Sequence, residues 1–148
     1  MSLYTLRPCT PADAPFARRV HREAYIDVVT RQFGVWDDDK QRGFFEAKWD
    51  PGLYRTIVVD SVDVGVTRYR FEAGHLHLDE IQLLPSAQGA GIGTAVIRDL
   101  QTEAQNAGLP LRLQVLKQNR ARALYQRLGF QVTGETEHHY QMEWRFAC

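Results

Sequence analysis

Hydrophobic and polar residues alternate, or β-branched residues cluster, in several short segments of the chain, and both patterns predict β-strands. The expected strands are residues 4–7, 55–60, 64–71, 75–84, 111–116, 130–132 and 140–146. The three strands between 55 and 84 are joined by short turns, which is typical of an antiparallel meander. We therefore expect a sheet at the centre of the molecule.

Apolar residues spaced by three and four predict helices before, between and after these strands. The first should start at a Thr10 cap with Pro11 in its first turn, run through Tyr25 and be followed by a break at residues 30–34. Three further helices are expected at residues 37–48, 92–106 and 120–128. The chain of residues 1–148 thus predicts one mixed α/β domain with about four helices.

The charge balance excludes a general electrostatic attraction to nucleic acid or anionic membranes, because Lys plus Arg and Asp plus Glu both number 18. No apolar run approaches the roughly 20 residues of a membrane span, and the first residues lack the regions of a signal peptide. Two cysteines, Cys9 and Cys148, stand near opposite ends, and we expect them to be reduced. These observations predict a cytoplasmic protein without nucleic-acid or membrane partners.

Three glycines, Gly89, Gly91 and Gly93, follow the strand that ends at Pro85 and lead directly into an amphipathic helix, whose apolar face begins at Ile92. Free backbone N–H groups at a helix start carry roughly half a positive charge in sum, so they attract anions. Glycines let a phosphate approach these amides closely. The order of strand, glycine loop and helix therefore predicts an anion site; the alternative is a glycine turn that only starts the helix.

Two phosphate-binding motifs do not fit this loop. A dinucleotide fingerprint needs a further glycine where Thr94 stands, and an acidic residue after the next strand, which instead runs into Lys117, Gln118 and Asn119. A Walker loop needs a Gly-Lys-Ser/Thr triplet, which the sequence lacks. A dinucleotide-dependent enzyme is therefore a weak alternative.

The pattern Gln88-x-x-Gly91-x-Gly93 resembles the pyrophosphate loop of the GCN5-related N-acetyltransferase (GNAT) superfamily. One helix and one strand later, residues 119–130 resemble a second stretch of that superfamily, which combines an asparagine, a small residue and Tyr-x-x-x-Gly-Phe. The chain departs from it at Arg122, where the family has alanine. The matching positions of the second stretch are Asn119, Tyr125, Gly129 and Phe130.

The resemblance implies a mostly antiparallel sheet that is splayed open beside the glycine loop, with acetyl-CoA as the cofactor in the gap. It implies that the backbone of Leu83 and Leu84 pairs with the pantetheine arm, that the loop amides hold the pyrophosphate, and that Asn119 contacts the arm from the other side. The residues expected to bind the coenzyme are Leu83, Leu84, Gln88, Gly89, Ala90, Gly91, Ile92, Gly93, Thr94, Asn119, Arg122 and Tyr125.

Transfer of an acetyl group to an amine needs a proton acceptor for the amine and a proton donor for the departing thiolate. Tyr125 is the expected donor, because a phenol with a pKa near 10 stays protonated at neutral pH; packing at the helix end is the alternative. Glu80 is the expected acceptor, because alternation places it on one strand face with Leu76 and Leu78. A bulge would bring Asp79 forward instead, and an ion pair with an arginine is the alternative role.

The sequence predicts an N-acetyltransferase that acts on a primary amine of a small molecule by direct transfer, with a homodimer left open. A non-catalytic acyl-CoA-binding module and acetylation of a protein or peptide amine are the alternatives. Histidine and cysteine spacing fits no metal site, and His75 and His77 are expected to be exposed. Residues 37–39 suit a cationic acceptor, although a helix N-terminus also explains them. The expected acceptor-site residues are Tyr25, Trp36, Asp37, Glu80 and His139.

Overall fold

A mixed seven-stranded sheet forms the centre of the computed structural model, which describes residues 3–146, and the strand order is β1-β2-β3-β4-β5-β7-β6. Only the β4–β5 pairing is parallel. The strands are β1 (Thr5–Pro8), β2 (Tyr54–Val59), β3 (Val62–Phe71), β4 (Leu76–Leu83), β5 (Leu111–Leu116), β6 (Gln131–Glu135) and β7 (His139–Trp144). The prediction of a mostly antiparallel mixed sheet is confirmed.

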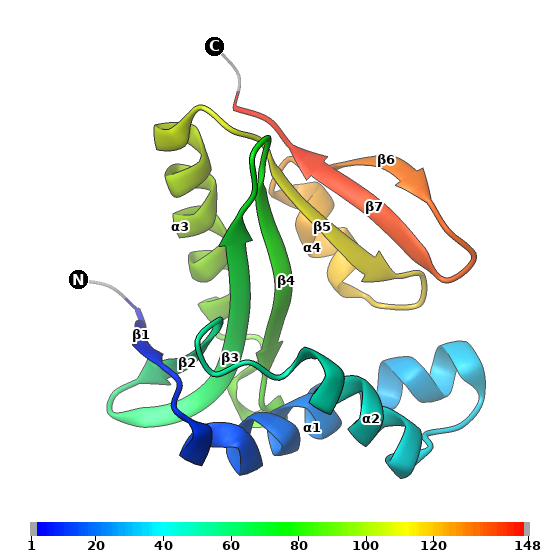
Figure 1. Ribbon diagram of the computed structural model, residues 1–148. Coiled ribbons are helices and arrows are strands. Elements are labelled where there is room, and N and C mark those ends of the chain that lie inside the picture. Colours follow the sequence, from blue (N-terminus) through cyan, green and yellow to red (C-terminus); the bar gives the residue numbers. More distant parts are fainter. Residues whose placement is uncertain (1–2, 147–148) are drawn as a thin grey trace.

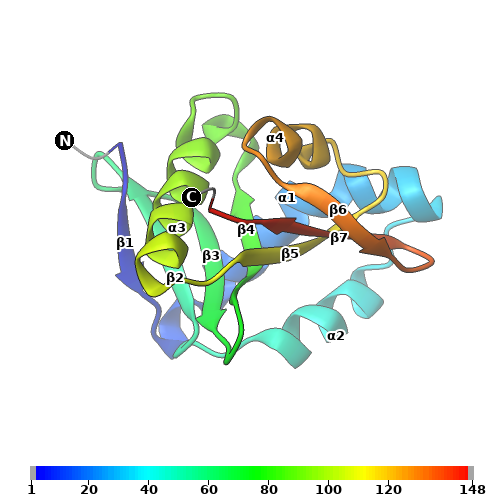
Figure 2. The same ribbon diagram turned by 90° about the horizontal axis from the view of Figure 1, so that it is seen from above.

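Helices cover both faces of the sheet (Figures 1 and 2). They are α1 (Ala14–Phe33), α2 (Asp38–Lys48), α3 (Ile92–Ala107) and α4 (Ala121–Arg127), with the 3-10 turns η1 (Pro11–Asp13) and η2 (Pro85–Ala87). One buried cluster joins α3 and α4 to the sheet through Val96, Leu100 and Tyr125. A second cluster joins α1 and α2 to the other face through Val20 and Phe45.

The sheet opens between β4 and β5, and this opening creates room for a site. The two strands pair only over Leu76–Leu78 and Leu111–Leu113. Beyond these residues they diverge toward the end of the sheet that carries α1, as Figure 1 shows. The splayed sheet that the resemblance implied is therefore present, and the edge of β4 that faces β5 pairs with no strand of residues 3–146 from Asp79 onward.

A β-bulge in β4 changes which face its later residues occupy. Tyr69 of β3 pairs with Leu78, but the next residue back, Arg68, pairs with Glu80, so Asp79 is the extra residue. Leu78 belongs to the cluster under α3, whereas Leu84 belongs to the cluster under α1 and α2. The expectation that Glu80 shares a face with Leu76 and Leu78 is wrong, because the bulge inverts the alternation and turns Glu80 toward α1.

The first helix is longer than the sequence pattern predicted. It continues past Tyr25 through residues 26–30 and ends at Phe33, where Gly34 adopts a left-handed conformation with φ 84°. The predicted break is therefore a single glycine cap. The additional turns carry the end of α1 across to the loop before α4, and this position becomes important for the site.

The structure also bears on several smaller expectations from the sequence. Gly129 has φ 96° and Phe130 is buried, as the second motif implied. His75 and His77 are half-buried rather than exposed, because they hydrogen-bond each other at 3.2 Å. Cys9 is buried and free, while Cys148 lies outside the described residues.

Candidate active site

One cavity of about 620 Å³ occupies the opening between β4 and β5 and extends to the glycine loop; we call it the central cavity. Its walls come from α1, β4, the loop before α3, β5 and α4, elements that are far apart in the sequence. The predicted coenzyme residues that line it are Leu83, Gln88, Gly89, Gly91, Ile92, Gly93, Thr94, Asn119 and Tyr125. Leu84, Ala90 and Arg122 do not line it.

The glycine loop presents unused amides to this cavity. Gly89 and Gly91 have φ 79° and 83°, in the left-handed region that favours glycine, and Gly91 is the cap of α3. The first intrahelical bond runs from the Ala95 amide to the Gly91 carbonyl at 3.0 Å. Among residues 3–146, no amide from 89 to 94 donates to another protein group. These donors and the positive helix end suit a diphosphate.

Gly93 shows that the loop is shaped for something other than the protein itself. Its backbone is ordinary helix, and an added Cβ would meet only Leu83 Cδ1, at 3.9 Å. A glycine near a helix start costs stability relative to alanine, and no contact of the fold requires it here. Close approach of a ligand to the Gly93 amide explains it.

The unpaired edge of β4 offers backbone groups at Ile81 and Leu83. The Leu84 amide donates to the Val64 carbonyl at 2.9 Å, so Leu84 and Val64 form a hydrogen-bonded pair across β3 and β4. In an antiparallel ladder such pairs alternate with pairs whose groups point outward. The groups of Leu83, opposite Gly65, therefore face the opening, where its carbonyl accepts a hydrogen bond from Gln88 Nε2 at 3.0 Å and its amide is free of protein partners among the described residues, whereas the groups of Leu84 are used within the protein. Of the two predicted residues, only Leu83 can pair with a pantetheine arm.

Tyr125 lies at the inner end of the cavity, where α4 holds it against Phe130. Only 7% of the residue is exposed, and its hydroxyl has no hydrogen-bond partner among the described residues. Burial, and then the nearby Glu80 carboxylate, raise the pKa of Tyr125. The phenol therefore keeps its proton at neutral pH and faces the cavity, as a proton donor to sulfur must.

The start of α4 explains one predicted coenzyme contact and removes another. Asn119 Oδ1 accepts a hydrogen bond from the Ala121 amide at 2.9 Å just before α4, which fixes the side chain and leaves its NH₂ group for a ligand. Arg122 was expected at the coenzyme, but its guanidinium lies over the Tyr140 ring at 4.7 Å, outside the cavity. Arg120 and Arg127 of the same segment line the cavity instead.

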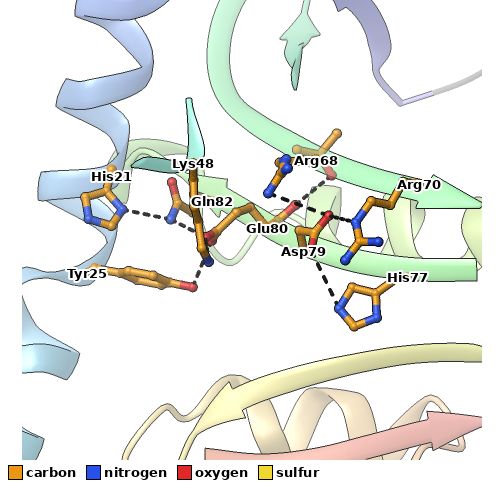
Figure 3. Close-up of polar contacts among 10 residues, drawn as sticks. His21, Tyr25, Lys48, Arg68, Arg70, His77, Asp79, Glu80 and Gln82 are labelled. Atoms are coloured by element: carbon orange, nitrogen blue, oxygen red, sulfur yellow. Dashed lines mark hydrogen bonds and ion pairs between the residues drawn. The ribbon is translucent and has the colours of Figure 1, made fainter. Parts of the chain in front are cut away.

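Glu80 is the centre of a polar cluster on the α1 side of the cavity (Figure 3). Its carboxylate is 7% exposed and accepts hydrogen bonds from Lys48 Nζ at 3.0 Å, Gln82 Nε2 at 3.0 Å and Tyr25 Oη at 3.3 Å. Burial and then Glu80 raise the pKa of Tyr25, so its hydroxyl remains a donor. Three donors of this kind hold an ionised carboxylate in one position.

An ion pair with an arginine was the alternative role for Glu80, but the arginines pair instead with Asp79, the extra residue of the bulge. Asp79 pairs with Arg70 Nε at 3.1 Å and lies 3.9 Å from Arg68 and 3.6 Å from His77 (Figure 3). Asp79 also lines the cavity, but three basic groups already surround it. Glu80, with one lysine partner that is 53% exposed, is the better candidate for exchanging a proton.

His21 extends the cluster behind Glu80. Its Nδ1 lies 3.2 Å from Gln82 Nε2, and its ring packs against Tyr25, Trp36 and Phe45. Burial lowers the pKa of His21 despite the opposing influence of Glu80. The ring is therefore neutral at pH 7 and supports Gln82, which in turn orients Glu80.

Of the predicted acceptor residues, Tyr25 and Glu80 line the cavity, and three others do not. Trp36 belongs to an outer pocket between α1 and α2, where its Nε1 donates to Asp38 at 2.6 Å. Asp37 caps α2 by accepting from the Lys40 amide at 3.1 Å, which is the alternative role considered for it. His139 pairs with Leu116 in the β7–β5 ladder.

Sequence reasoning missed several residues that the fold brings to the site. They are His21, Lys48, Gln82, Arg120 and Arg127. Gln82 had a signal in principle, because a glutamine at a strand position between apolar residues is rarely buried without partners. The others follow only from the length of α1, the bulge and the end of α2. Within residues 3–146, no group of three or more His, Cys, Asp or Glu side chains is arranged to hold a metal ion.

The described helices include none that is both long and apolar enough to cross a bilayer. A family model described as an acetyltransferase (GNAT) domain matches residues 33–144. A comparison with curated proteins finds no match.

Comparison with solved structures finds the same fold in several proteins. The PaiA N-acetyltransferase of Thermoplasma acidophilum, crystallised with coenzyme A, is 19% identical with a TM-score of 0.80, over 99% of this chain and 100% of that chain. The ribosomal-protein-S18-alanine N-acetyltransferase of Escherichia coli is 20% identical with a TM-score of 0.68, over 98% and 96%. Ard1 of Thermoplasma volcanium is 16% identical with a TM-score of 0.64, over 95% and 96%.

Proposed function

Because this chain belongs to the GNAT acetyltransferase family, we propose that it transfers the acetyl group of acetyl-CoA to a primary amine of a small molecule. The observation that carries the proposal is that the loop amides, the Tyr125 phenol and the Glu80 carboxylate all line one cavity. An anion cradle alone would serve a binding module. A proton donor and a proton acceptor beside it are what amide formation needs.

The residues present fit a coenzyme A thioester. The amides of residues 89–94, which have no protein partners among the described residues, meet a diphosphate. The outward carbonyl of Leu83, which Gln88 Nε2 also contacts, accepts from an amide of the pantetheine arm, and the NH₂ group of Asn119 supports that arm. When bound, acetyl-CoA supplies the acetyl group as a thioester. The Leu83 amide is then the donor for the oxygen on which charge develops.

Protons move through two side chains in this proposal. Glu80 accepts the proton of the incoming ammonium, because only a neutral amine has a lone pair for attack. Tyr125 donates its phenolic proton to the departing sulfur. Direct transfer is favoured over a cysteine acyl-enzyme, since Cys9 lies in the cluster under α1 and α2, away from the cavity, and is the free cysteine of the described residues.

A small acceptor is favoured by a bridge across one end of the site, which we call the Gln32 bridge. Gln32 Nε2 donates to the His138 carbonyl at 2.8 Å, and Gln32 Oε1 accepts from the Gln118 amide at 3.0 Å. Phe33 packs on the His138 ring with centroids 4.9 Å apart. The end of α1 thus joins the β6–β7 turn to the loop before α4, so an extended peptide would have to displace these contacts.

Turnover is tested by release of the coenzyme A thiol with a panel of small primary amines and, in parallel, with short peptides that carry a free α-amine. We expect small amines to give the higher kcat/KM. Preference for the peptides would overturn the acceptor class but keep the acetyltransferase. The E. coli enzyme named above carries a ribosomal protein in its name, so the peptide arm is a real alternative.

A non-catalytic acyl-CoA-binding module is tested by Tyr125→Phe. The enzyme should lose about 10²-fold or more in kcat, the usual worth of a general acid, with little change in coenzyme Kd. A binding module would show no turnover with or without the Tyr125→Phe substitution. Tyr69→Phe is the matched control, because Tyr69 packs in the core under the Arg55 guanidinium and does not line the cavity.

A further inference from the structure

We propose that Lys48 is an internal acceptor, which the protein acetylates at Nζ from its own bound acetyl-CoA. This inference rests on the proposed function. It assigns a modification site to the last residue of α2, a helix that contains none of the predicted coenzyme-binding residues.

The Lys48 ammonium already contacts the expected proton acceptor, at the edge of the central cavity rather than in its lining. Its Nζ lies 3.0 Å from Glu80 Oε1, on the carboxylate whose other oxygen is bound by Gln82 and Tyr25 (Figure 3). Glu80 lines the central cavity, and its charge acts on the Tyr125 phenol, the expected proton donor. An amine supplied by the protein thus contacts the expected proton acceptor, and the expected proton donor lines the same cavity as that acceptor.

Lys48 also has the freedom that a reacting group needs. Its side chain is 53% exposed, and it leaves the helix at its final residue rather than from within a packed face. Only its terminal group is fixed, by the contact with Glu80. A four-carbon side chain anchored in this way can turn its nitrogen along the carboxylate toward the cavity without moving α2.

The transfer balances with acetyl-CoA as the one co-reactant. The ammonium of Lys48 gives a proton to Glu80, the neutral amine attacks the thioester carbonyl, a C–N bond forms and the C–S bond breaks. After the attack the nitrogen loses its second proton to solvent, and Glu80 passes the first one to solvent. The thiolate takes a proton from Tyr125, which regains one from solvent. The products are an uncharged Nζ-acetyl-lysine, coenzyme A as the thiol and one proton released to water, and Glu80 loses its cationic partner.

The sequence provides its own controls, because it has three lysines. Lys40 lies on the same helix, with its ammonium near the exposed Phe44 ring. Lys117 pairs with Glu135 at 2.6 Å. Neither ammonium contacts a residue that lines the cavity, so both report the background of chemical acetylation by the thioester.

The test is site-resolved mass spectrometry of the purified protein during incubation with acetyl-CoA. We expect Lys48 to gain acetyl groups at least about tenfold faster than Lys40 or Lys117, since it is held beside the reactive groups. The rate per molecule should not depend on protein concentration. Tyr125→Phe should slow Lys48 by about 10²-fold and leave the other two lysines unchanged. Similar rates at all three lysines, or a Lys48 rate that Tyr125→Phe does not change, would overturn the proposal.

A second measurement needs no coenzyme. Reductive methylation with isotope-labelled formaldehyde marks each lysine nitrogen for NMR, and Lys48→Arg assigns its signal. Glu80→Gln should shift the Lys48 methyl signal and leave those of Lys40 and Lys117 in place. A Lys48 methyl signal that Glu80→Gln does not shift would show that the contact between the two side chains is absent, and this would overturn the inference.

The amine panel separates failure of this inference from failure of the proposed function. Turnover of small amines without preferential acetylation of Lys48 refutes the inference alone. Acetylation of Lys48 without turnover of any small amine refutes the proposed acceptor class and keeps the inference. Absence of both refutes both.

Discussion

The two sides of the central cavity are built in different ways. The coenzyme side is made of backbone amides from one continuous stretch, residues 88–94, in which side chains matter chiefly by being absent. The acceptor side is made of side chains from α1, α2 and β4, each held by another side chain. A backbone site tolerates changes of side chain and fails when a Cβ intrudes, whereas a side-chain site fails when any member of its network is replaced.

Among the substitutions that test this difference between the two sides, Gly93→Ala should have the largest effect on binding, with Gly43→Ala as its control. Both glycines lie in helices with open space for a Cβ, so both variants should gain up to about 1 kcal/mol in unfolding free energy. Only Gly93→Ala should weaken the binding of coenzyme A. Its Kd should rise by about 10- to 100-fold, because a charge-assisted hydrogen bond contributes about that much to affinity. Denaturant unfolding and calorimetry measure the two quantities.

Unchanged affinity in Gly93→Ala would mean that the phosphates do not approach this amide. Thr94→Ala checks the other half of the comparison, since it removes a side chain and keeps the amide. Its coenzyme Kd should remain within about threefold of the starting value, and a larger loss would show that side chains contribute to this half as well.

A smaller effect is expected on the acceptor side from Gln82→Met, with Gln101→Met as its control. Both glutamines are buried and each donates from Nε2, Gln82 to Glu80 and Gln101 to the Leu128 carbonyl. Each variant should lose about 1–3 kcal/mol of stability, because each removes a buried hydrogen bond. Only Gln82→Met should also lower kcat/KM for the amine, by about tenfold, since Glu80 is no longer oriented.

If both variants lower kcat/KM equally, the loss comes from general destabilisation and the acceptor side is not a network. Measuring kcat/KM well below the melting temperature of each variant keeps the two effects separate.

Removal of the Gln32 bridge should change the selectivity between bulky and compact amines by only a few-fold. Gln32→Ala removes both of its side-chain hydrogen bonds, and each exposed bond is worth about 0.5–1.5 kcal/mol at most. The ratio of kcat/KM for a bulky amine to that for a compact one should rise by about two- to fivefold. Gln118→Ala is the control, because Gln118 contributes its backbone amide and loses nothing there. An unchanged ratio would remove the bridge as a limit on acceptor size.

The smallest effect is expected in the pH dependence of stability. Burial lowers the pKa of His21, so between that value and the usual value near 6.5 the unfolded chain binds more protons than the folded protein. The unfolding free energy should therefore fall as the pH drops below about 6.5. His21→Gln should make this fall shallower but not abolish it, since the pKa values of His75, His77 and His139 are lowered as well. Denaturant unfolding at a series of pH values measures it, and an identical slope would contradict the burial of a neutral His21.

The same contrast explains how far the sequence could be read. The glycine loop was predictable because its chemistry depends on residues within one turn of each other, and the helix at residue 92 began where the pattern indicated. The face of Glu80 was not predictable, because one extra residue at Asp79 inverts the alternation and no local signal marks it. Lys48 was missed because its position depends on how α2 packs, and Arg122 was misplaced because Tyr140, in another strand, attracts it.

The brief parallel seam between β4 and β5 has a mechanical consequence. Strands β5, β7 and β6 form one leaf of the sheet and β1 to β4 the other, and hydrogen bonds between strands join the leaves only over Leu76–Leu78 and Leu111–Leu113. A molecule lodged in the split therefore adds contacts between two leaves that are otherwise joined by this short ladder and by the buried cluster under α3 and α4. Hydrogen exchange in β7, which lies beside β5 in the second leaf, should slow when the split is filled.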